Sequence, residues 1–158
     1  IVYKNTAESS EHIALVKGDV STESPTLVRM HGFNIFDYIY SANKTFELHR
    51  AMEIIADEGR GVIVLVRSPS VTVLSDYVRE HIGAVNQSKS LMKESSTLFK
   101  DYGVGAQILR DLGVREMILL SNTKRSIVGL EGHDLKIVEQ RPIGHSSVRP
   151  VAAGASHA

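Results

Sequence analysis

An unbroken run of branched aliphatic residues, Val62–Val66, constrains the fold of this chain more than any other segment. It follows a stretch from Thr45 to Glu58 with helical periodicity, for which Thr45 is the predicted N-cap and Gly59 the stop. The apolar positions of this helix are Leu48, Ala51, Met52 and Ile55. A strand without polar alternation is typical of a sheet covered on both faces. The pattern therefore predicts a single domain of the α/β class, in its mixed α+β form. We expect a mixed sheet that is packed by helices.

The alternation of helices and strands continues along the chain. Strands are predicted at His12–Val16, Thr26–His31, Met117–Leu120 and Leu135–Glu139, and helices at Asp101–Leu112, ended by Gly113, and Lys124–Leu130. The stretch Val71–Phe99 is less regular, with helical character near Leu74–Ile82. Residues 1–10 are interpreted as a linker and residues 144–158 as a flexible tail. One domain, residues 11–143, is of ordinary size for a single core.

Charge and cysteine content exclude several classes of function. Lysine plus arginine and aspartate plus glutamate number 18 each, so no net field attracts nucleic acid or an anionic membrane. No apolar run reaches the roughly 20 residues of a membrane span, and the polar start has no signal-peptide core. We therefore expect a cytoplasmic protein. The absence of cysteine excludes disulfides, thiolate metal sites and cysteine nucleophiles.

General catalytic motifs give little support to an enzyme. The seven histidines do not form an HExxH or His-x-His arrangement, and Gly103-Val104-Gly105 lies at a helix start without the third glycine of a dinucleotide loop. The segment Ser121–Arg125 follows a predicted buried strand and precedes a predicted helix, where backbone N–H groups and two cations can meet a phosphate. A helix cap with solvated charges is the alternative explanation.

Five blocks of sequence, in this order and spacing, resemble the GTP cyclohydrolase II family. They are His12–Val20, Leu27–His31, Ala56–Val62, Asp101–Val114 and Gly129–Gly132. The resemblance is strongest to the form fused behind 3,4-dihydroxy-2-butanone 4-phosphate synthase in bifunctional riboflavin enzymes. A start at Ile1 rather than at methionine fits a C-terminal domain of such a fusion.

The resemblance implies a zinc site whose ligands this chain lacks. In the family three cysteines hold the metal, one shortly after the motif that ends here at His31 and two in a Cys-Asp-Cys step before the first long helix. Here Gly32-Phe33-Asn34 follows His31, and Ala42-Asn43-Lys44 stands at the step. Without zinc, no metal lowers the pKa of water from near 16 toward roughly 7 for attack on guanine. We therefore expect no metal and no other cofactor.

The resemblance also implies the site residues, several of which differ from the family pattern. Tyr77 matches the catalytic tyrosine, whereas Lys100 stands at the catalytic arginine and Leu98 at the aspartate before it. Only the first arginine of the nucleotide-binding signature remains, as Arg67. The positions expected to contact nucleotide or phosphate are Arg29, Arg67, Ser121, Asn122 and Lys124.

Taken together, these changes predict a domain that retains the fold and has lost the original catalysis. The resemblance implies a homodimer attached to an active dihydroxybutanone phosphate synthase domain, with an assembly or regulatory role and GTP or another phosphate as a possible ligand. The alternative is a hydrolase acting on GTP or a related nucleotide through Tyr77, Lys100 and a metal held by histidine or carboxylate ligands.

Overall fold

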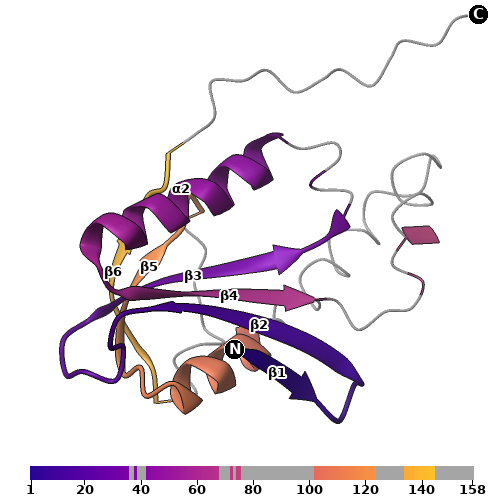
Figure 1. Ribbon diagram of the computed structural model, residues 1–158, viewed down its shortest axis with the longest axis horizontal. Helices are drawn as coiled ribbons and strands as arrows, with labels where there is room; N and C mark the ends of the chain where they lie inside the picture. The colour runs from indigo at the N-terminus through magenta and orange to yellow at the C-terminus, as the bar shows by residue number, and fades with distance from the viewer. Residues whose placement is uncertain are drawn as a thin grey trace, which may run out of the picture.

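The computed structural model shows a six-stranded mixed sheet with a helix on each face (Figure 1). It describes residues 1–35, 38, 42–67, 72, 74–75, 102–123 and 134–144. The strands are β1 (Val2–Asn5), β2 (Ser10–Lys17), β3 (Thr26–Phe33), β4 (Gly61–Arg67), β5 (Glu116–Leu120) and β6 (Lys136–Arg141). Their order across the sheet is β1-β2-β4-β3-β5-β6. This arrangement confirms the predicted mixed sheet packed by helices.

Four neighbouring strands of the sheet run parallel. β3 pairs in parallel with β4 on one side and β5 on the other, and β6 continues in parallel beside β5. β2 runs antiparallel to β4 and joins β1 to the sheet as an antiparallel edge. The carboxyl ends of β3, β4 and β5 therefore lie along the same edge, which is where open α/β sheets commonly bind ligands.

Helix α2 (Ala42–Glu58) covers one face of the parallel strands. Leu48, Ala51 and Ile55 are buried there, as their spacing predicts, whereas Met52, predicted on the same face, is exposed. They pack with residues of three strands and of the segment after β6: Leu27, Ile63, Leu120 and Ile143. Gly59 ends the helix as expected. Its φ of +80° favours glycine, and its N–H donates to the carbonyl oxygen of Ile55 at 3.0 Å.

The helix 102–111, orange in Figure 1, covers the opposite face. Its side chains Ala106, Ile108 and Leu109 enter a core built from the strand residues that alternate with those facing α2. Gly105 approaches β3 so closely that an added Cβ would lie 1.8 Å from Cε of Met30. Close packing of helix on sheet, rather than a cofactor loop, explains glycine at this position.

The N-terminal segment differs from the expected linker. Residues 2–5 form β1, and the N-terminal ammonium of Ile1 donates to the carbonyl oxygen of Ala14 at 3.0 Å. The hydroxyl of Tyr3 donates to Oδ2 of Asp111 at 2.9 Å, which ties this edge to the helix 102–111. Backbone pairing at the sheet edge therefore orders a segment whose polar composition resembles a linker.

The other predicted elements agree with the structure to within a few residues. α2 begins at Ala42, so Thr45 lies inside the helix and is not its N-cap. The predicted helix Lys124–Leu130, nearly all of Val71–Phe99 and the tail beyond Gly144 lie outside the described residues. In the part of the chain that the structure describes, no helix has the length and apolar character needed to cross a membrane.

Candidate functional site

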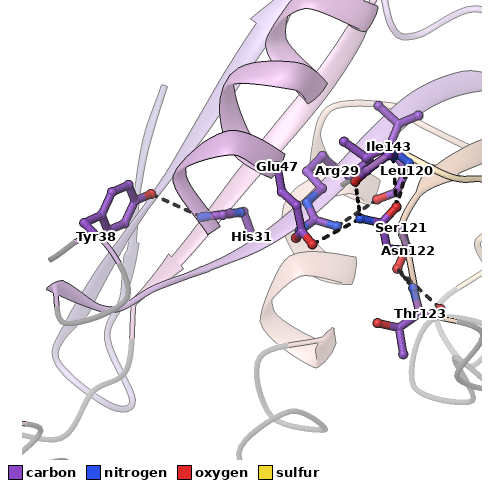
Figure 2. A network of polar contacts seen from close by, with 10 residues as sticks. Arg29, His31, Tyr38, Glu47, Leu120, Ser121, Asn122, Thr123 and Ile143 are labelled. Carbon is purple, nitrogen blue, oxygen red and sulfur yellow. Dashed lines mark hydrogen bonds and ion pairs between the residues drawn. The ribbon is translucent and has the colours of Figure 1, made fainter. Parts of the chain in front are cut away.

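Arg29 lies on β3 and forms an ion pair with α2 (Figure 2). Its Nη2 donates to Oε2 of Glu47 at 2.6 Å, and its Nη1 donates to the backbone carbonyl of Leu120 at 3.0 Å. Arg29 is 7% exposed, so Glu47 neutralises a cation that would otherwise be buried alone. The guanidinium thereby joins β3, α2 and the end of β5.

Asn122 extends this network from the end of β5 to the segment after β6. Its Nδ2 donates to Oε1 of Glu47 at 3.2 Å and to the carbonyl oxygen of Gly144 at 2.7 Å. Its Oδ1 accepts from the backbone N–H groups of Ile143 at 2.9 Å and Gly144 at 3.1 Å. The side-chain amide therefore pairs with the backbone much as another strand would, and both of its polar atoms are engaged.

His31 lies two residues beyond Arg29 on the same face of β3 and is 2% exposed. Its Nε2 is 3.1 Å from the hydroxyl of Tyr38, and the two rings meet edge to face. Burial lowers the pKa of His31 to about 4, and the positive charges of Arg29 and Lys44 act in the same direction. The imidazole is therefore neutral near pH 7.

A second buried histidine, His12, holds the end of β4 from the other face of the sheet. The backbone N–H of Arg67 donates to its Nδ1 at 3.2 Å, so Nε2 carries the proton and donates to Oγ of Ser10 at 3.1 Å. Burial lowers the pKa of His12, and the charge of Arg67 adds to this effect. A neutral His12 therefore fixes the position at which β4 ends.

The structure brings together some of the residues predicted to contact phosphate. Arg29 and Asn122 meet through Glu47, whereas the exposed Arg67 ends β4, which β3 separates from β5. Ser121 follows β5, and its Oγ accepts from the N–H of Thr123 at 3.2 Å. Ser121 is thus engaged in a local turn, while the predicted helix that it would cap lies outside the described residues.

The remaining predicted site residues cannot be placed in this network. Tyr77 and Lys100, the positions matching the catalytic residues, lie outside the described residues. The predicted phosphate contact Lys124 lies outside them as well.

The sequence did not identify Glu47, which joins the predicted site residues Arg29 and Asn122. Glu47 stands one helical turn before the buried Ala51, so its spacing places it on the covered face of α2. An acidic residue on a covered face indicates a buried cationic partner. Tyr38 was missed as well, and its position between a strand and a helix gives no comparable signal.

Comparison with known proteins shows the family. The sequence model of GTP cyclohydrolase II matches residues 1–142. This chain belongs to the GTP cyclohydrolase II family. It is 37% identical over 151 residues to riboflavin biosynthesis protein RibBA of Bacillus cytotoxicus and 36% identical over 151 residues to that of Bacillus cereus. Each alignment covers 90% of this chain and 38% of the relative, so the chain spans well under half the length of these relatives.

A solved structure is also similar, though at a low overall score. It is described as RibBX, a two domain 3,4-dihydroxy-2-butanone 4-phosphate synthase from A. baumannii. The TM-score is 0.45 with 28% sequence identity, over 82% of this chain and 32% of the other.

The zinc ion that the GTP cyclohydrolase II resemblance implies does not fit the residues present. The chain has no cysteine. Its described portion contains no group of three or more histidine, cysteine, aspartate or glutamate side chains placed to hold a metal. Nε2 of His31 faces the Tyr38 hydroxyl, so this ring alone does not supply the four ligands that a zinc ion needs.

Proposed function

We propose that this chain is a cytoplasmic GTP cyclohydrolase II domain of riboflavin biosynthesis that does not open the guanine ring. In this proposal it has an assembly or regulatory role, as a homodimer, beside a 3,4-dihydroxy-2-butanone 4-phosphate synthase domain. The names of its relatives, riboflavin biosynthesis proteins RibBA, support the pathway, and the 38% of their length that this chain covers agrees with a further domain beside it.

The ion pair between Arg29 and Glu47 is the single observation that most supports the proposed loss of activity. An arginine that binds a nucleotide must present its N–H groups to phosphate or base oxygens. Here the two terminal nitrogens donate to a carboxylate and a backbone carbonyl within the domain. Asn122 is engaged in the same way. The engagement of Arg29 and Asn122 within the domain supports a structural role for these two positions in place of nucleotide binding.

Zinc analysis combined with an assay for formate release tests this proposal. The chain is purified with zinc present throughout, its metal content is measured, and GTP is added at millimolar concentration. We expect no stoichiometric zinc and no formate, while a GTP cyclohydrolase II with all three cysteines, assayed in parallel, releases formate. Stoichiometric metal together with turnover would instead support the alternative hydrolase, in which Tyr77 and Lys100 act.

The regulatory role predicts an effect on the synthase. Synthase activity is measured with the domain attached and with the domain removed, and the oligomeric state is measured by light scattering. We expect removal to change the activity, the oligomeric state or both. Identical activity and an identical oligomer without the domain would contradict the role.

A weak anion site at the carboxyl edge of the sheet is a second proposal. It is supported by the exposed side chain of Arg67, which ends β4 at the carboxyl edge of the parallel strands. Calorimetric titration with GTP and with inorganic phosphate tests it. We expect binding that Arg67→Ala abolishes and Arg50→Ala, on the exposed side of α2, leaves unchanged. No heat at millimolar ligand would end the proposal.

A further inference from the structure

Two buried side-chain nitrogen atoms, from residues two apart on β3, lack hydrogen-bond partners among the described residues. They are Nε of Arg29 and Nδ1 of His31. The other nitrogens of both side chains are engaged, with Glu47, Leu120 and Tyr38. Buried polar atoms in folded proteins are nearly always satisfied by protein or by ordered water, so this pair calls for a partner.

The geometry places both atoms on the same side of the sheet. Residues two apart on a strand project to one face, with their Cα atoms roughly 6.6 Å apart. One water molecule whose two hydrogen bonds of about 2.9 Å meet at a near-tetrahedral angle spans roughly 4.7 Å, so it joins the two nitrogens where the side chains converge by about 2 Å. Figure 2 shows the Arg29 and His31 side chains on the same side of the sheet as Glu47 of α2. We propose that a single internal water molecule bridges Nε of Arg29 and Nδ1 of His31.

The donors and acceptors of this bridge fix the tautomer of His31. Nε of Arg29 can only donate, so it donates to the water oxygen. The water then donates one hydrogen to Nδ1 of His31, which must be the unprotonated ring nitrogen. Nε2 carries the ring proton and donates to the Tyr38 hydroxyl at 3.1 Å. One water molecule thus satisfies both buried atoms and completes a chain of hydrogen bonds from Glu47 to Tyr38.

Charge distinguishes water from the other small occupants. A metal cation at Nδ1 would gain one nitrogen ligand and meet the positive charges of Arg29 and Lys44, while the opposing carboxylate of Glu47 is already paired with Arg29. An anion such as chloride needs a donor from each side, and therefore a proton on Nδ1 rather than on Nε2. The tautomer of His31 thus separates an anion from water, and a response to zinc detects a metal.

Nuclear magnetic resonance of the whole 158-residue chain, labelled with ¹⁵N, tests the bridge. Long-range ¹H–¹⁵N correlations report which nitrogen of His31 is protonated, and water-selective cross-relaxation reports a long-lived water beside the Nε–H of Arg29. We expect the Nε2–H tautomer and a water cross-peak, both unchanged by added zinc chloride or sodium chloride. The exposed His49 shows whether zinc binds histidine rings non-specifically.

Two variants give the test its controls. His31→Phe removes the acceptor, so we expect it to abolish the water cross-peak to Arg29. Tyr38→Phe removes the hydroxyl and leaves Nδ1 in place, so the cross-peak persists. If His31→Phe fails to fold, the tautomer and cross-peak of the unaltered chain still decide the question. An Nδ1–H tautomer, a shift of the His31 signals with chloride or zinc, or no water cross-peak at Arg29 overturns the proposal.

Discussion

Oε2 of Glu47 lies 2.6 Å from Nη2 of Arg29, and the side chains are 18% and 9% exposed. This ion pair joins a helix to a central strand of the sheet. Because both groups are largely withdrawn from water, removing one leaves the other charge without compensation. A substitution that neutralises one of these charges should therefore destabilise the packing of α2, even where it changes side-chain volume and helix propensity little.

Glu47→Gln tests the contribution of this pair to stability. We expect the free energy of unfolding to fall by about 3 kcal/mol, because the buried Arg29 loses its counterion. Urea denaturation followed by circular dichroism measures the change. Glu53→Gln is the matched control, since its exposed pair with Arg50 contributes no more than about 0.5 kcal/mol. Equal losses in the two variants would show that Arg29 does not depend on Glu47.

Asn122→Asp replaces two N–H donors by a carboxylate facing the carboxylate of Glu47 and the carbonyl of Gly144. We expect a loss of about 2 kcal/mol from repulsion and lost hydrogen bonds. Hydrogen exchange at the amides of Ile143 and Gly144 should accelerate, because both donate to Asn122. The exposed Thr123→Ala serves as the control and should leave their exchange unchanged.

The buried His31 predicts a loss of stability in mild acid. Its pKa is about 4 when folded and near 6.5 when unfolded, so the unfolded state binds the proton more readily as the pH falls. The stabilisation is present above about pH 6.5 and is lost progressively toward pH 4. Between pH 7 and pH 5 this group alone removes about 2 kcal/mol.

Urea midpoints at the two pH values check this slope. His31→Gln should flatten it, whereas His49→Gln, at an exposed position, should leave it as in the unaltered chain. The lowered pKa of His12 gives the same sign, so a residual slope in His31→Gln is expected. An unchanged slope would show that His31 does not titrate as its burial implies.

Two glycines of one helix should respond oppositely to alanine. Gly105→Ala places a Cβ 1.8 Å from Cε of Met30, the flexible end of a side chain that must move aside, so we expect a loss of no more than about 1 kcal/mol despite better helix propensity. Gly103→Ala has open space around its Cβ and should stabilise the chain by up to about 1 kcal/mol. Thermal denaturation compares them. Met30→Val, which shortens the obstructing side chain, should recover part of the loss caused by Gly105→Ala.

The sequence predicts the centre of this fold better than its edges. The run Val62–Val66 identifies β4 because a strand covered on both faces contains only apolar residues. β1 was mistaken for a linker because an edge strand of four residues alternates between exposed and half-buried positions and is held mainly by backbone pairing. Likewise, Thr45 has the chemistry of an N-cap, but α2 begins one turn earlier at Ala42.

For the candidate site, the sequence predicted positions that lie together but not the partner that joins them. Resemblance identified Arg29 and Asn122, and the structure places them in one network. Their engagement depends on Glu47, which no motif marks. A motif specifies residue types along the chain, whereas the partner of a strand side chain such as Arg29 depends on the helix that packs against that face of the sheet. Only the three-dimensional arrangement shows that the anion beside Arg29 belongs to the protein.

The position of β3 between β4 and β5 also has a consequence for how the chain folds. Thr26 pairs with Met117, so one edge of this central strand finds its partner only after some ninety intervening residues. Parallel pairing between segments far apart in the sequence loses loop-closure entropy before its contacts stabilise the chain, and this slows folding. During synthesis, β3 and β4 can pair early while the β5 side of β3 stays open, which exposes an apolar strand edge to other chains until the last third emerges.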